Sequence, residues 1–209
     1  MNSTAQKNEL IFAYSSGNLA EAKSLFTSMY LYLNSVASKK ASIFDNILAQ
    51  NLDDLDGIKL KKLKYSDCIK GKKPTKEIVK SNKNPLANVV GDLKNINWKS
   101  VYKGFKEFSI PIKDNDSVKL IKMDPGASVP LHSHSGKEYI LVVDGSFCDE
   151  NGEYKKGDMQ INDQNIKHHP VASKSDGCIC LSITENDVIF FGKFGPLLHL
   201  FTFIKSFFK

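Results

Sequence analysis

The chain has 209 residues, which is enough for one large domain or two small ones, and its composition is that of an ordinary globular protein. Its formal net charge is +6, and all 29 basic residues are lysine. Because proteins that read DNA sequence rely on the planar fork of arginine, the lack of arginine argues against direct, sequence-specific DNA binding.

The sequence indicates a cytoplasmic protein that does not enter a membrane. Its first ten residues, MNSTAQKNEL, lack the basic region and apolar core of a signal peptide. The most apolar stretch, residues 190–208, is interrupted by lysine, glycine and proline, so we do not expect a membrane-spanning helix there.

Residues 8–50 are predicted to be helical. Apolar side chains recur at helical spacing from Leu10 to Val36, and Gly17 with Asn18 marks the stop between two helices. A third, short helix is expected over residues 43–50. Such small helices cannot bury a large core, and we assign residues 1–50 to a small helical domain.

Residues 51–97 have a different composition. They are dense in lysine and contain Gly71, Pro74 and Pro85, which is typical of a solvated linker with one short helical piece. The alternative is a basic arm that binds an acidic partner or nucleic acid.

From Trp98 onward, short alternating segments such as SVKLIKM, YILVVDGSF and CICLSI are separated by turn sequences. This pattern predicts many short strands in a sandwich or barrel over residues 98–209. The expected fold class is therefore α+β, with a helical domain followed by a β domain.

A set of metal-ligand residues stands within the β region. His132 and His134 are two residues apart, so both side chains point to one face of a strand. After a bend, Glu138 begins the next strand, and His168 arrives from a strand expected to run antiparallel nearby. Three imidazoles and one carboxylate suit zinc, iron, nickel, copper or manganese.

The spacing G-x5-H-x-H-x3-E-x6-G over residues 126–145 resembles the first motif of the cupin superfamily, and GDMQINDQNIKHH resembles the second. This resemblance implies a double-stranded β-helix, or jelly-roll barrel, with one metal ion per chain. It places the family's second-motif histidine at His168. The neighbouring His169 should point to the other face, as a surface or packing histidine.

A closer resemblance is to the ChrR-like zinc-binding anti-sigma factors. It rests on the DQ-x3-H-x-P-V-A run, the CICL strand and ELIFAYSSGNLAEAKSLF near the N-terminus, and it covers nearly the whole chain outside residues 51–97. It implies an N-terminal domain that binds an extracytoplasmic-function sigma factor, a C-terminal cupin, and a zinc ion in each.

The family's N-terminal zinc ligands are missing from this chain. Their positions are occupied by Ala5, Tyr30, Asn34 and Ala37, none of which is a normal ligand of such a site. We therefore expect one zinc per chain, in the barrel. The helices should be held by packing, with Tyr30 filling the space of the metal.

The preferred function is a metal-binding transcriptional regulator that senses a small molecule or oxidant and sequesters a sigma factor through its N-terminal helices. No residue is then catalytic, and iron, nickel or manganese are alternatives to zinc. The rival interpretation is a metal-dependent cupin dioxygenase, because such a ligand set leaves room for substrate. A regulator that has lost its sigma partner is a third alternative.

The remaining candidates receive simpler interpretations. Cys178 and Cys180 share a strand face and are expected to pack as small apolar residues, with redox-active thiols near the metal as the alternative. Asp149 and Glu150 are attributed to a hairpin turn. Cys68, Cys148 and His199 are assigned no functional role. The C-terminal tail, which contains His199, is expected to add a strand to the barrel or to pack against a second copy in a homodimer.

Overall fold

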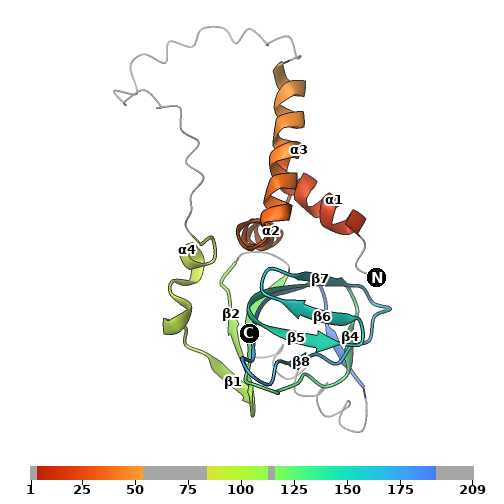
Figure 1. Ribbon diagram of the computed structural model, residues 1–209. Helices are drawn as coiled ribbons and strands as arrows, with labels where there is room; N and C mark the ends of the chain where they lie inside the picture. Colours follow the sequence, from red (N-terminus) through yellow and green to blue (C-terminus); the bar gives the residue numbers. More distant parts are fainter. Residues whose placement is uncertain (1–3, 54–83, 113–115, 192–209) are drawn as a thin grey trace.

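The computed structural model describes residues 4–53, 84–112 and 116–191. Three helices form an N-terminal arm: α1 (Thr4–Ser15), α2 (Glu21–Leu33) and α3 (Ser35–Asp53). They lie on one side of a β barrel, with α3 projecting away from it (Figure 1). The predicted α+β architecture, helices first and barrel second, is confirmed.

The break between α1 and α2 lies where the sequence places it. Gly17 has a positive φ of 70°, and the backbone N–H of Asn18 donates to the carbonyl of Ala13 over 2.8 Å. This backbone turn ends α1 with the left-handed residue that commonly closes a helix.

The third helix begins eight residues earlier than expected, at Ser35 rather than at residue 43. Asn34 caps it, because its Oδ1 accepts a hydrogen bond of 3.0 Å from the backbone N–H of Ala37. The first turns of α3 are rich in serine, lysine and alanine, so they lack the apolar periodicity on which the prediction relied.

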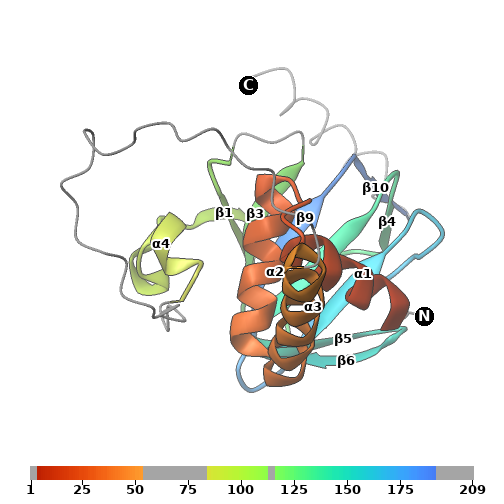
Figure 2. The same ribbon diagram turned by 90° about the horizontal axis from the view of Figure 1, so that it is seen from above.

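The arm and the barrel share one hydrophobic core. Phe26 and Met29 of α2 are buried in the same cluster as Leu141 and Ile183 of the barrel. The ring of Phe26 meets that of Tyr139 edge-on, with 6.0 Å between centroids. Viewed from above, α2 lies across the barrel (Figure 2), where it contacts β5 and β9. The arm is thus packed onto the barrel and is not held at a distance.

Part of the predicted linker is described. Residues 54–83 lie outside the described residues, whereas α4 (Ala87–Val90) and the 3-10 helix η2 (Leu93–Asn95) follow them. Leu86 and Ile96 are buried in the shared core. These two side chains anchor the end of the segment to the rest of the chain.

The β domain consists of antiparallel strands arranged around β5 (Glu138–Asp149), which pairs with β6, β7, β8 and β9. The larger sheet runs in the order β1-β2-β3-β9-β5-β6, and β4 pairs with β10 in a small second sheet. The bounds of the other strands are β1 Lys99–Tyr102, β2 Phe105–Ser109, β3 Ser117–Met123, β4 His132–His134, β6 Gly152–Lys155, β7 Met159–Asn162, β8 Val171–Ala172, β9 Cys178–Thr184 and β10 Val188–Phe190.

Two glycines of the first motif, Gly126 and Gly145, both have a positive φ, but their surroundings differ. A Cβ at Gly145 would lie 2.2 Å from the carbonyl oxygen of Gly177, whereas the nearest atom to a Cβ at Gly126 is a side-chain carbon of Lys174 at 3.9 Å. The pairing of β5 with β9 shifts register between Val142 and Asp144, just before Gly145, and the backbones at Gly145 and Gly177 approach closely.

This difference predicts unequal costs for two matched substitutions. Gly126→Ala should cost about 1 kcal/mol, the strain of a left-handed alanine, and lower the Tm by about 3 °C. Gly145→Ala must also push two strands apart, so we expect about 4 kcal/mol and a fall in Tm of about 10 °C. Thermal unfolding followed by circular dichroism measures both, and equal shifts would contradict the argument.

Candidate metal centre

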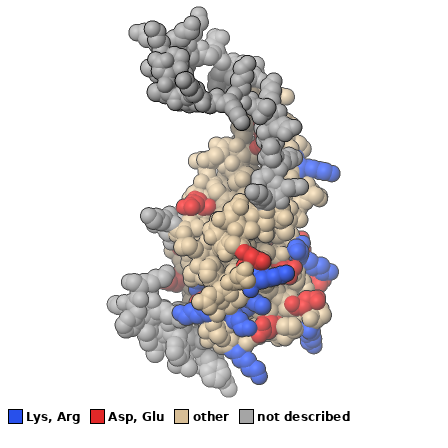
Figure 3. All heavy atoms as spheres, turned by 90° about the vertical axis from the view of Figure 1, so that its left-hand side faces the viewer, with Lys and Arg blue, Asp and Glu red and all other residues tan. Residues whose placement is uncertain are grey.

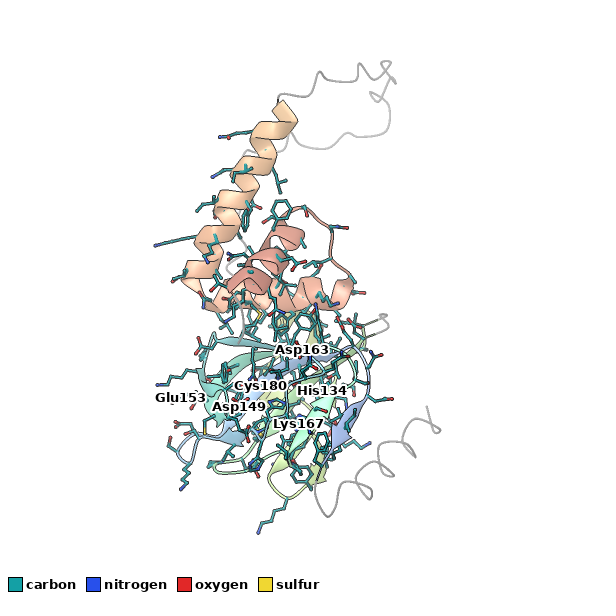
Figure 4. The ribbon with its side chains drawn as sticks, turned by 90° about the vertical axis from the view of Figure 1, so that its right-hand side faces the viewer. His134, Asp149, Glu153, Asp163, Lys167 and Cys180 are labelled. Carbon is teal, nitrogen blue, oxygen red and sulfur yellow. The ribbon has the colours of Figure 1, made fainter. Side chains whose placement is uncertain are left out.

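The four predicted ligands meet inside the barrel. His132 and His134 stand on β4 and point to the same side, as their spacing of two predicts. The backbones of His132 and His168 exchange two hydrogen bonds, of 3.1 and 3.0 Å, which place these histidines opposite one another. All four residues are buried, and Figure 4 shows His134 within the barrel.

Glu138 enters the site because the chain turns sharply between β4 and β5. The turn consists of Ser135, Gly136 and Lys137, as expected, and Glu138 is the first residue of β5. A Cβ at Gly136 would lie 2.6 Å from Nδ2 of Asn186, so a residue with a side chain would displace its neighbour. Glycine is therefore favoured here by close packing.

The potential ligand atoms are spaced like the ligands of one ion. Nε2 of His134 lies 3.0 Å and Nε2 of His168 lies 3.4 Å from Oε2 of Glu138, and the Nε2 atoms of His132 and His168 are 3.0 Å apart. All four ligand atoms lie within 4.8 Å of one another. Ligands about 2.1 Å from a tetrahedral metal ion stand roughly 3.4 Å apart, so the cluster has the dimensions of a metal site.

Two of the histidines are oriented by their second ring nitrogen. Nδ1 of His132 lies 2.8 Å from the carbonyl oxygen of Pro130, and Nδ1 of His168 lies 3.1 Å from Oδ2 of Asp149. Since both partners are acceptors, each Nδ1 donates, and each Nε2 is directed toward the common centre. Such outer partners are characteristic of histidines that bind metals.

A metal ion fits the residues that are present. Both ring nitrogens of His134 are buried without a hydrogen-bond partner, and the contact of its Nε2 with Glu138 lacks hydrogen-bond geometry. The Nε2 atoms of His132 and His168 also lie 3.0 Å apart at this centre. Buried polar atoms left in this way cost free energy, and a cation at the centre would satisfy them together.

The electrostatics of the cluster also favour a positive charge. Burial raises the pKa of Glu138, but its contacts with His134 and His168 outweigh burial and hold that pKa well below the ordinary range. Burial lowers the pKa of His168, yet Asp149 and Glu138 raise it to about 9. Burial lowers the pKa of His132 to about 4. Glu138 and Asp149 therefore stay ionised inside the barrel, where either the proton on His168 or a bound metal ion can balance their charge.

Asp149 has a larger role than the hairpin turn to which its sequence position was attributed. Besides receiving the backbone N–H of Asn151 in that turn, its fully buried side chain binds Nδ1 of His168. Nε2 of Gln160 donates to the same Oδ2 over 2.7 Å. Asp149 also lies within the barrel in Figure 4. The turn interpretation was therefore incomplete, because Asp149 ends β5 directly beside a ligand.

Other sequence candidates lie outside the cluster. His169 is half-buried and its backbone N–H donates to Glu150. Cys178 and Cys180 are buried with their sulfurs 3.1 Å apart, and the contact with Cys178, together with burial, raises the pKa of the Cys180 thiol. Cys148 is exposed. Cys68, His199 and the C-terminal tail lie outside the described residues.

The four positions that the resemblance assigns to an N-terminal zinc site lie as follows in the structure. Tyr30 and Ala37 are buried in the core of the arm, and Ala5 is exposed. Asn34 caps α3, and its Nδ2 donates to the carbonyl of Gly157 in the barrel over 3.2 Å.

Comparison with known proteins agrees with this geometry. Residues 86–186 match the family model of the ChrR cupin-like domain. The anti-sigma-E factor ChrR of Cereibacter sphaeroides is 29% identical over 184 residues, which cover 84% of this chain and 86% of that protein. Over residues 86–186 this chain has a ChrR cupin-like domain. In the crystal structure of Rhodobacter sphaeroides SigE in complex with the anti-sigma ChrR, the matching chain superposes with a TM-score of 0.73 and 27% identity, over 85% of this chain and 96% of its own.

The likeness to this relative extends across both the arm and the barrel, so it is not limited to the cupin motifs.

Among the residues that the structure describes, no helix has the length and apolarity needed to traverse a membrane.

If the four side chains hold a metal ion, Asp149→Asn should weaken its binding by about 10- to 100-fold, since outer partners of metal-bound histidines typically contribute that much. The asparagine amide keeps the shape of the side chain but lacks the negative charge that faces Nδ1 of His168. Glu150→Gln is the matched control, because the Glu150 carboxylate binds the backbone N–H of His169 and not a ring nitrogen of His168. Competition with a chromophoric chelator measures both affinities, and equal values would contradict a role for Asp149.

Proposed function

We propose that this ChrR-like protein is a metal-binding regulator whose barrel holds one zinc ion through His132, His134, Glu138 and His168. The observation that carries the proposal is the convergence of these four buried side chains inside a barrel related to that of ChrR. Zinc is the preferred ion because imidazole nitrogen and carboxylate oxygen form its usual four-ligand sites, and the bound ion would supply positive charge and folding free energy.

We further propose that the arm, residues 1–50, binds a sigma factor and keeps it inactive. The relative that matches both arm and barrel, ChrR, is seen in a crystal structure of its complex with SigE. Three apolar side chains of α3 are exposed and lie along one side of that helix: Val36 (64%), Ile43 (56%) and Ile47 (46%). Exposed apolar side chains grouped in this way are typical of a protein-binding surface.

In this proposal the state of the buried metal site controls whether the arm holds the sigma factor. An oxidant or small molecule that modifies a ligand or removes the metal would loosen the barrel, and the arm would release its partner. Such a stress response operates in the cytoplasm, where sigma factors meet RNA polymerase.

The face shown in Figure 3 does not favour direct DNA binding, because lysine and acidic side chains are interspersed over the described part of the barrel.

The first test is the metal content of the purified protein. We expect one equivalent of zinc per chain, and His168→Ala should lower both metal content and Tm because binding is coupled to folding. His169→Ala is the matched control and should keep the metal. Two equivalents of zinc, or loss of metal in His169→Ala only, would contradict the assignment. Iron together with oxygen uptake would instead support a dioxygenase.

The second test is capture of the partner from the source cells, with the full chain as bait. We expect a sigma factor to be retained by the wild type and lost with Ile43→Lys, since a buried lysine at the interface is costly. Val101→Lys, on the exposed β1, is the control. Equal retention by both variants would exclude the α3 surface, and failure of the wild type to retain a sigma factor would contradict sigma binding.

A further inference from the structure

A short segment that follows β9 lies against the turn that carries two of the proposed ligands. The backbones of Glu185 and Lys137 are joined by a hydrogen bond of 3.0 Å, and the N–H of Ser135 donates to the carbonyl of Asp187 over 3.0 Å. Between these two contacts, Asn186 packs against Gly136. We call residues 185–187 the clamp segment. It covers the turn between His134 and Glu138 at each of its three residues.

The clamp segment is also bound to the helical arm. Oε2 of Glu185 accepts the backbone N–H of Lys137 over 3.2 Å, while Oε1 accepts Nζ of Lys23, on α2, over 2.8 Å. One carboxylate therefore links the ligand turn to the arm. Asp116 lies 3.7 Å from the same Nζ, which places that lysine between two acidic groups.

Tyr139 adds a second link at the same place. It follows Glu138 directly in β5, and its hydroxyl donates to Oε1 of Glu185 over 3.4 Å. Its ring packs edge-on against the fully buried Phe26, and Nζ of Lys23 lies 5.3 Å from the ring centroid. Tyr139 thus joins the position next to Glu138 to two residues of α2, Phe26 and Lys23.

The other end of α2 touches the barrel independently of this contact. The carbonyl of Gly157 accepts a hydrogen bond from Asn34, and a Cβ at Gly157 would lie 3.1 Å from the carbonyl oxygen of Leu33. The arm can therefore remain attached and folded when the contact at Lys23 weakens.

We propose that Glu185 and Lys23 couple the metal site to the helical arm, so that metal occupancy controls how firmly α2 is held on the barrel. This proposal rests on the proposed metal binding and adds the route by which it would reach the arm. A metal ion fixes His134 and Glu138, and hence the turn between them; the fixed turn holds the clamp segment, and Glu185 holds Lys23.

Coupling between two sites is reciprocal, which gives a sharp test. If the metal strengthens the contact of the arm with the barrel, then a change in the arm must weaken metal binding, although no arm residue is a ligand. The part of the link that these residues form is the partly exposed ion pair of Lys23 with Glu185, so Lys23→Met and Glu185→Gln should each weaken zinc binding by about three-fold. Because both remove the same contact, the double variant should be no weaker than either single variant.

The experiment measures zinc affinity of the full chain by competition with a chromophoric chelator. Lys40→Met is the matched control, since Lys40 donates to Asn8 within the arm and should leave the affinity unchanged. Lys23→Arg should restore most of it. Hydrogen exchange of the zinc-loaded protein gives a second readout: Lys23→Met should increase exchange at the amides of Ser135 and Lys137, and Lys40→Met should not.

Failure of the wild type to bind zinc would overturn the proposed function and the coupling together. Zinc binding by the wild type with unchanged affinity in Lys23→Met and Glu185→Gln would overturn only the coupling. An equal loss in Lys40→Met would show that the arm acts through its general stability, which also overturns the coupling. If Lys23→Met fails to fold, Glu185→Gln alone decides.

Discussion

The buried carboxylate of Glu138 is the constraint on which the rest of the barrel depends. An ionised carboxylate inside a protein is costly unless positive charge and hydrogen bonds surround it. Here Asn162 donates to Oε2 over 3.2 Å, and His134 and His168 stand within 3.4 Å of the same atom. The strands that provide these groups must therefore meet at one point, and β5, which begins with Glu138, pairs with four other strands.

The stability of the helical arm depends on apolar packing against the barrel. Three helices of this length are marginally stable alone, and related proteins are expected to reinforce them with a zinc ion. The positions that the resemblance assigns to those ligands hold none here, and the buried Phe26 and Met29 join the arm to the barrel core. At one former ligand position Asn34 caps α3 and binds the barrel, so the residue that replaces a ligand also contributes to docking.

Sequence reasoning was most successful where the chemistry is local. The spacing of His132 and His134, the bend before Glu138 and the strand that precedes His168 all follow from the two-residue period of a strand and from a motif of fixed length. Asp149 escaped notice because it contacts His168 across 19 residues, and its turn sequence already had an explanation. The clamp segment escaped for a similar reason, since nothing in the letters END indicates that these residues cover a turn about fifty residues earlier. The start of α3 was misplaced because a capping asparagine and a polar first turn leave no apolar period to count.

The core shared by the arm and the barrel has a consequence for how the protein is made. The helices are synthesised first, but the strands against which α2 packs, β5 and β9, are separated from it by more than a hundred residues of chain. Until β9 has left the ribosome, Phe26 and Met29 have no barrel to cover them and remain available to chaperones. The arm therefore reaches its final form only when the barrel is complete, so that a prematurely terminated chain would not present a finished arm to any partner.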